Sequence, residues 1–276
     1  MKILIYERAK TIFFMYRISP TVKNLLIINV LMFAATYLFG SQFRFDLTGH
    51  LALYYPGSDY FRPYQFITHM FMHGGIPHIF FNMYALWMFG TAVENSWGGK
   101  RFLFYYLFCG LGAAALHTLV NYFIFSGMAA EITAFANSPA PEIFKHFVEA
   151  HKDHFNQNVY GFLNQWSLSP GDPEYAAMAL EQMHRVYQAT LDIPTVGASG
   201  AIFGILLVFG MMYPDVQLMF IFLPVPIKAK WMVIGYGALE LVLGVLQPGS
   251  SIAHFAHLGG MLFGFILIKY WTRRST

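Results

Sequence analysis

Long apolar runs recur along this sequence and limit its fold more than any other feature. Six runs approach the ~20 residues that a helix needs to cross a bilayer; they cover about residues 25–39, 79–93, 102–125, 198–213, 231–246 and 252–271. Hydrophobic residues make up 57% of the chain and charged residues 11%, against roughly 45–50% and 25% in soluble domains. The sequence therefore predicts an all-α, multi-pass membrane protein with a six-helix bundle.

The basic residues predict how these spans are oriented. Lys and Arg gather in the N-terminal stretch, at Lys100 and Arg101, around Lys228 and in the tail from Lys269 onward. Because cytoplasmic loops are enriched in these residues, both termini are expected in the cytoplasm. The first 24 residues interleave charges with short apolar pieces, so no cleavable signal peptide is expected. We expect the bacterial inner membrane, with an organelle membrane as the alternative, and no nucleic-acid partner.

One long polar stretch, residues 126–194, separates the third and fourth spans and is expected on the outer, periplasmic side. Within it, residues 141–155 and 173–190 predict amphipathic helices, and Asp172 is the expected N-cap of the second. The segment SLSPGDP between them is expected to be a loop. We therefore expect a single membrane domain over residues 1–276 that carries a polar, largely helical insertion. A cap at the membrane surface is the favoured role, and substrate recognition is the alternative.

A serine in the segment TVGASGAIFG is the first candidate for chemistry, because polar groups at membrane depth are costly and mark functional sites. Ser199 needs a base, since a hydroxyl is a weak nucleophile, and His257 on the last span can supply one. Small residues let two membrane helices approach closely; they accompany both side chains, at Gly197, Gly200, Gly260 and Gly264. The sequence thus predicts that Ser199 and His257 come within hydrogen-bond reach.

A serine nucleophile also needs hydrogen-bond donors for the oxyanion that forms during attack. His78 and Asn82 are four residues apart and share one helical face. The backbone amide of Ser199, near a helix start, is a third expected donor. No carboxylate is expected beside His257, so the predicted pair is a Ser–His dyad with slow turnover.

The remaining polar candidates are assigned no chemistry. His69 and His73 have the spacing of a zinc pair, but no glutamate stands between them to act as a base. They are expected to form hydrogen bonds within the first loop, and His254 is expected to be structural or to line a cavity. Glu94 is expected to be structural, and Glu240 receives no role. We expect neither a metal nor a cofactor.

These motifs resemble those of the rhomboid intramembrane serine proteases. The resemblance rests on GASG, on AHLGG, on the His78-x-x-x-Asn82 spacing and on the block FRPYQFITHMFMHGGIPHIFFN. It extends over about residues 23–270 and is interrupted by residues 126–194, for which it implies no function.

The resemblance implies a role for each matching residue. Ser199 would attack the scissile carbonyl, and His257 would act as general base and then as general acid. His78, Asn82 and the Ser199 amide would bind the oxyanion. Phe203 stands where an aromatic residue, often tyrosine, stacks on the catalytic histidine. Substrates would be single-span membrane proteins cut in or near the span, without metal or cofactor.

Three other classes of function are weighed against this one. A catalytically inactive membrane scaffold would usually lack the nucleophile or the base, and both are present. A transporter would be favoured by inverted repeats and broken helices, which the sequence does not display. A metal-dependent intramembrane protease would be inhibited by a chelator. The sequence leaves the natural substrate and the oligomeric state open.

Overall fold

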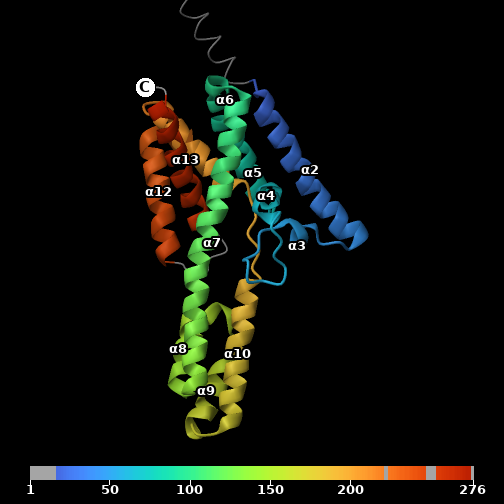
Figure 1. Cartoon of the computed structure of the whole chain (residues 1–276), viewed down its shortest axis with the longest axis vertical. Helices are drawn as coiled ribbons and strands as arrows, with labels where there is room; N and C mark the ends of the chain where they lie inside the picture. The colour runs from blue at the N-terminus through green and yellow to red at the C-terminus, as the bar shows by residue number, and fades with distance from the viewer. Residues whose placement is uncertain (1–16, 221–222, 247–252, 275–276) are drawn as a thin grey trace, which may run out of the picture. The chain divides into compact units, whose positions relative to one another are not determined.

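The structure is a computed structural model that describes residues 17–220, 223–246 and 253–274. The charged residues of the N-terminal stretch before residue 17 lie outside this description. The described chain is mostly helical (Figure 1). It forms two compact units. The first comprises the described residues within Met1–Leu53, Arg62–Thr118 and Pro194–Thr276, and the second comprises Tyr54–Phe61 and Leu119–Ile193.

Each of the six predicted apolar runs overlaps one or more described helices, although the third run extends past Thr118 into the second unit. The elements of the first unit, with the first part of α7, are α2 (Pro20–Phe43), α3 (Leu47–Leu51), α4 (Gln65–Thr68), η1 (His69–Phe71), α5 (Ile76–Ala85), η2 (Leu86–Gly90), α6 (Thr91–Trp97), α7 (Gly99–Asn137), α11 (Ser199–Met212), α12 (Ala229–Leu246) and α13 (His254–Arg274). The second predicted run is divided among α5, η2 and α6. These three elements follow one another without an intervening loop, and η2 between them is a π-helical turn.

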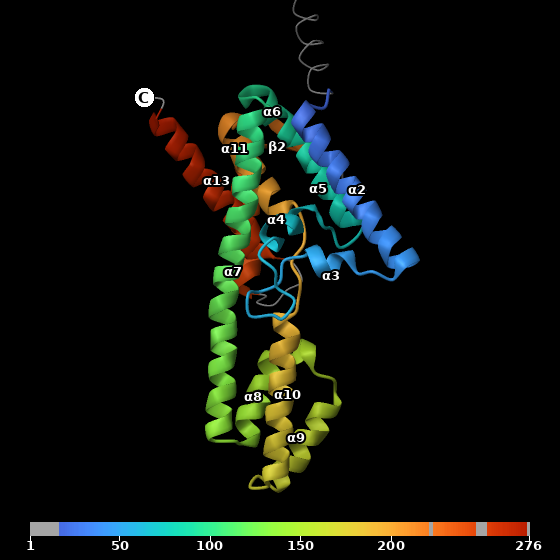
Figure 2. The same cartoon turned by 45° about the vertical axis from the view of Figure 1, so that its right-hand side comes forward.

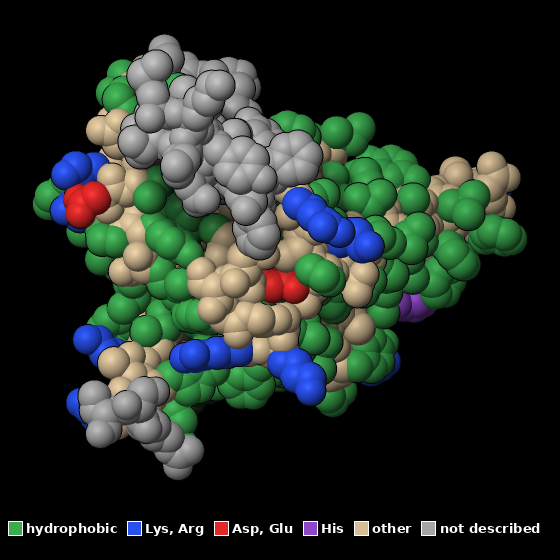
Figure 3. Space-filling model, turned by 90° about the horizontal axis from the view of Figure 1, so that it is seen from above, with side chains coloured by type: hydrophobic (Ala, Val, Ile, Leu, Met, Phe, Trp, Pro, Cys, Tyr) green, Lys and Arg blue, Asp and Glu red, His purple; other side chains and the backbone are tan. Residues whose placement is uncertain are grey.

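Three of the described helices are long and apolar enough to cross a membrane: α2, α7 and α12. The apolar helix α11 is shorter. Several large hydrophobic side chains point away from the protein, among them Leu31 on α2 and Leu241 on α12, which are 62% and 52% exposed. Such surfaces would be costly in water and are suited to lipid. At the end of the first unit where α6 lies, Lys and Arg side chains are visible beside this hydrophobic surface (Figure 3).

The core of the first unit is built around α11, whose most extensive contact is with α13. Ile205 of α11 and Phe102, Tyr105 and Cys109 of α7 are fully buried there. Tyr105 donates a hydrogen bond of 2.8 Å to the backbone oxygen of Gly204. This hydrogen bond joins α7 to α11. Most residues of α11 are buried by neighbouring helices, whereas α2 and α12 expose large hydrophobic side chains.

The expectation of an all-α chain was incomplete, because a β-hairpin connects α11 and α12. Its strands β1 (Gln217–Phe220) and β2 (Leu223–Lys228) pair antiparallel, with Gln217 opposite Lys228. The segment contains two prolines within LPVPIK, which exclude a regular helix. Asp215 precedes the hairpin and lies 3.0 Å from Nζ of both Lys228 and Lys230.

The second unit has a core of its own, formed by the end of α7 with α8 (Pro141–Ala150), α9 (Asn158–Leu168) and α10 (Pro173–Leu191). The short helix η3 (Lys152–His154), between α8 and α9, has no buried residue. Helices α8, α9 and α10 lie together in both ribbon views (Figure 2). Trp166, Phe144 and Met183 are fully buried between them.

Two helices of the second unit were predicted and one was not. The predicted helices are α8, which is shorter than expected, and α10. Asp172 is the N-cap of α10, as expected, and its Oδ1 accepts a 2.9 Å hydrogen bond from the Glu174 amide. Helix α9 was missed, and its last residue, Leu168, lies within the expected loop. Helix α7 continues to Asn137 without a break at residue 126, where the polar stretch was expected to begin.

Candidate active site

Ser199 and His257 meet between α11 and α13, as the sequence predicted. Ser199 is the first residue of α11, and His257 lies in the first turn of α13. The Ser199 Oγ atom is 2.8 Å from His257 Nε2, a hydrogen-bond distance. Both side chains are partly buried. A hydroxyl that donates to a neutral imidazole nitrogen is the starting arrangement for nucleophilic attack.

The ring of His257 is held from one face by Phe203. The two ring centroids are 4.2 Å apart and the planes differ by 5°. Phe203 follows Ser199 by one helical turn, so the same helix supplies the hydroxyl and the stacking ring. The ring contact that the resemblance implies is therefore present, without a hydroxyl group on the aromatic residue.

Glycines allow this approach because side chains at their positions would collide with the facing helix. A Cβ atom added to Gly260 would lie 1.8 Å from the backbone oxygen of Gly200. A Cβ on Gly200 would lie 2.4 Å from Ala113 Cβ on α7. Gly264 serves a different neighbour, since its Cβ would lie 2.4 Å from the Tyr105 hydroxyl. The predicted small-residue face thus packs α13 against both α11 and α7.

Gly197 separates the candidate nucleophile from His78. Its φ of +126° lies in the region that favours glycine. An added Cβ would lie 2.8 Å from His78 Nε2 and 3.5 Å from Ser199 Oγ. Any larger residue would therefore occupy the space between these two polar groups.

His78 and Asn82 both lie on α5, as expected, and each offers a donor. The amide of Gly74 is 3.4 Å from His78 Nδ1 and donates to it, which favours a proton on Nε2. Asn82 is buried, and within the described part of the chain its Nδ2 donor has no hydrogen-bond partner. Buried donors are rarely left unpaired. A buried amide with an unpaired donor is suited to binding a transient anion.

A carboxylate lies beside His257, contrary to expectation. Glu240 on α12 places Oε2 3.0 Å from His257 Nδ1 and 2.6 Å from His254 Nδ1. The first of these contacts lacks the alignment of a hydrogen bond, and His257 Nδ1 has no other partner among the described residues. Periodicity within one helix cannot indicate this contact, because the three residues come from two helices. The clue was a lone buried acid in an apolar span.

The same three residues form a group whose donor atoms could hold a metal ion, all within 4.8 Å of one another. A tetrahedral zinc ion with ligands at about 2.0–2.1 Å holds them about 3.3 Å apart. Glu240 and His254 are closer than that, at 2.6 Å. The arrangement fits direct contact between the side chains, and an ion would have to separate them.

The other candidate polar residues have separate surroundings. His69 Nδ1 lies 2.8 Å from the backbone oxygen of Gln65, a contact within the first loop as expected. His73 is buried beside the ring of His78, and its nitrogens find no partner in the described chain. Burial lowers the pKa of His69 and of His73 to about 4. Both loop histidines are therefore neutral near pH 7.

Glu94 has the structural position that was expected. Its carboxylate accepts hydrogen bonds from the Ser19 hydroxyl at 2.5 Å and from the amides of Thr21 and Val22 at 2.9 Å each. Because the first amides of a helix have no partner inside it, this contact anchors the start of α2.

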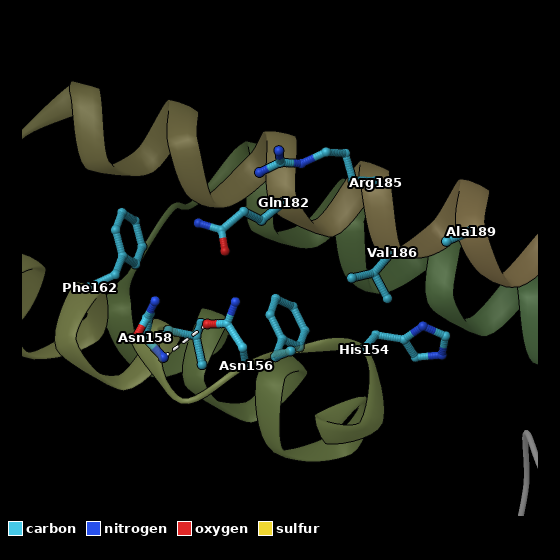
Figure 4. Close-up of a pocket in the computed structure, with 10 residues that line it drawn as sticks. His154, Asn156, Asn158, Phe162, Gln182, Arg185, Val186 and Ala189 are labelled. Atoms are coloured by element: carbon cyan, nitrogen blue, oxygen red, sulfur yellow. Dashed lines mark hydrogen bonds between the residues drawn. The ribbon is translucent and has the colours of Figure 1, made fainter.

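A hollow lies in the second unit, between α10 and the segment from η3 to α9 (Figure 4). It measures about 470 Å³ and combines aromatic side chains with amides and one guanidinium, including Phe162, Asn156, Gln182 and Arg185. None of the predicted site residues lines it.

Fold and site together define a helical, multi-pass membrane protein with a serine–histidine contact at the junction of two helices. The Rhomboid domain family matches residues 60–139 and 174–274 of this chain. The chain therefore belongs to the rhomboid family. The unmatched residues 140–173 include α8, η3 and α9 of the second unit.

A curated relative supports the same membership over a short stretch. The chain is 46% identical over 48 residues to Rhomboid protease GluP of Bacillus subtilis (strain 168). This stretch is 17% of the present chain and 10% of the relative, so the match spans a tenth of that protein's length.

Proposed function

We propose that this protein is an intramembrane serine endopeptidase that hydrolyses peptide bonds in or near transmembrane segments of membrane proteins. The observation that carries the proposal is the 2.8 Å contact between Ser199 Oγ and His257 Nε2. Rhomboid family membership supports the same activity and substrate class.

In this mechanism Ser199 Oγ attacks the scissile carbonyl carbon while His257 Nε2 takes the hydroxyl proton. The resulting imidazolium returns that proton to the leaving amine, which departs and leaves an acyl group on Ser199. A water molecule then gives a proton to Nε2 and attacks the ester carbon. The ester bond to Ser199 breaks, the acyl group leaves as a carboxylic acid, and the Nε2 proton returns to Ser199 Oγ. No step requires a metal ion or a cofactor.

The developing oxyanion would be bound by the Ser199 amide, His78 Nε2–H and Asn82 Nδ2–H. Removing one such donor typically costs about 10²–10³ in kcat. Gly197, Gly200, Gly260, Gly264 and Phe203 would support this site, because they set the helix approach and the ring position.

We propose six membrane spans with both termini in the cytoplasm, in a bacterial inner membrane. The end of the first unit at which Lys100, Arg101 and Lys269 lie would face the cytoplasm. Residues 126–194 would then form a largely helical insertion on the periplasmic side. The independent core of the second unit supports a folded insertion.

A catalytically inactive membrane scaffold is the alternative function. Fluorophosphonate labelling of the detergent-purified protein separates the two, because the probe bonds only to an activated serine. We expect wild type to label and Ser199→Ala and His257→Ala to lose labelling. Ser41→Ala, which removes an exposed hydroxyl on α2, is the matched control and should label like wild type.

Labelling should be followed by cleavage of single-span substrates in liposomes, with Ser199→Ala as the inactive reference. Wild type that stays unlabelled, under conditions in which an established rhomboid protease reacts, would refute the proposed activity and favour the scaffold.

A further inference from the structure

Glu240 reaches the side of His257 that faces away from the nucleophile. His257 Nε2 is 2.8 Å from Ser199 Oγ, and His257 Nδ1 is 3.0 Å from Glu240 Oε2. A histidine that accepts a proton at Nε2 must carry its other proton on Nδ1. The contact is not aligned as a hydrogen bond, but the negative charge of the carboxylate lies where it favours a proton on Nδ1, the tautomer that the proposed reaction needs.

The carboxylate is held in this place by a second histidine. His254 Nδ1 lies 2.6 Å from the same Oε2 atom, and the side chains of His254 and Glu240 are only 4% and 10% exposed. Helix α12 approaches α13 closely here, because a Cβ on Gly244 would lie 3.2 Å from His254 Cβ. Glu240 is thus fixed before any substrate arrives.

Attack by Ser199 creates a positive charge on a partly buried ring. An unpaired buried charge is costly, whereas a neighbouring carboxylate offsets much of that cost. Two other titratable groups that interact electrostatically with His257 are His78 on α5 and His117 on α7. Neither histidine can supply a negative charge, so Glu240 is the group that can compensate the imidazolium.

We propose that Glu240, anchored by His254, is a positioning residue whose negative charge favours the Nδ1–H tautomer of His257 and stabilises the charged form of that ring during attack. The proposal rests on the proposed roles of Ser199 and His257. When the Ser199 proton moves to Nε2, the Nδ1 proton stays on the ring and the carboxylate remains ionised. The arrangement is a Ser–His–Glu triad assembled from α11, α13 and α12.

A purely structural latch between α12 and α13 would use the same contacts, so the test needs a readout that a latch would not move. The first-order fluorophosphonate labelling rate should be measured from pH 5 to 9 for wild type and Glu240→Gln, with thermal unfolding in the same detergent. We expect the labelling rate of Glu240→Gln to be about 10–10³-fold below that of wild type. This loss does not exceed the rate gain that a general base itself typically provides. The acidic limb should move to lower pH, because the imidazolium loses its neighbouring negative charge.

Glu94→Gln is the matched control, since Glu94 is also a buried carboxylate but accepts its hydrogen bonds from Ser19, Thr21 and Val22 at the start of α2. It should lower the unfolding temperature and leave the acidic limb unchanged. If Glu240→Gln cannot be recovered folded, Glu240→Asp is measured instead, because it keeps the charge and withdraws the oxygen by one methylene. A reduced rate is then expected.

The outcomes separate the two proposals. Labelling that is absent from wild type, or unaffected by Ser199→Ala, would refute the protease itself. If wild type labels at Ser199, and Glu240→Gln or Glu240→Asp keeps the wild-type labelling rate and pH profile, only the role of Glu240 in the triad would be overturned. A slower Glu240→Gln with an unmoved acidic limb would also overturn it and leave a latch.

Discussion

Replacement of Gly260 by alanine should inactivate the protein through the helix interface. The new Cβ would begin 1.8 Å from the Gly200 backbone oxygen, whereas carbon and oxygen settle at about 3.3 Å. The facing backbones must therefore separate by about 1.5 Å in total. Half of that shift would lengthen the 2.8 Å contact between Ser199 and His257 beyond hydrogen-bond range. A misplacement near 1 Å costs about 10²-fold in rate, and overpacking costs about 1–3 kcal/mol of stability.

The fluorophosphonate labelling rate and the unfolding temperature in detergent test this reasoning together. Gly235→Ala on α12 is the matched control, because an added Cβ there meets nothing within 4 Å. It should leave both quantities near the wild-type values. Gly260→Ala that labels within about threefold of wild type would show that backbone contact between α11 and α13 does not set the site geometry.

Two further predictions concern the rings around the site. Phe203→Leu removes a stacked ring worth about 0.5–1.5 kcal/mol, so labelling should slow by up to about tenfold, while Phe203→Tyr should retain the rate; equal rates for both variants would contradict a role for the ring. The His73 pKa falls from 6.5 in the unfolded chain to about 4 in the folded one, so its stability contribution is complete above pH 6.5 and is lost as the pH falls toward 4. Between pH 7 and pH 5, His73→Met should lose about 2 kcal/mol less stability than wild type in detergent unfolding; equal losses would show that His73 is not the group that titrates.

The features that the sequence predicted depend on patterns within one helix. Apolar runs located helices of the first unit, and the glycines around Ser199 and His257 indicated two helices in close contact. Those signals are strong because membrane depth and backbone approach restrict the residue types that a position tolerates.

The features that were missed depend on contacts between elements or on a change of surroundings. The contact of Glu240 with His257 depends on which face of α12 is turned toward α13, and hydropathy does not indicate this for an apolar helix. Helix α7 was expected to end near residue 125, because polarity rises after it. Residues 126–137 nevertheless include Met, Ala and Glu, which are good helix formers. The rise in polarity after residue 125 accompanies the part of α7 that packs in the second unit, and it does not mark the end of the helix.

The single cysteine of the chain, Cys109, is fully buried against the glycines of α11 and α13. Because reagents cannot reach this thiol, the folded native protein should not react with sulfhydryl reagents. A cysteine introduced at one exposed position, such as Leu241 on α12, would then be the only reactive thiol in the folded protein. Spin labels or fluorophores could therefore report on a chosen helix without first removing a native residue from the core.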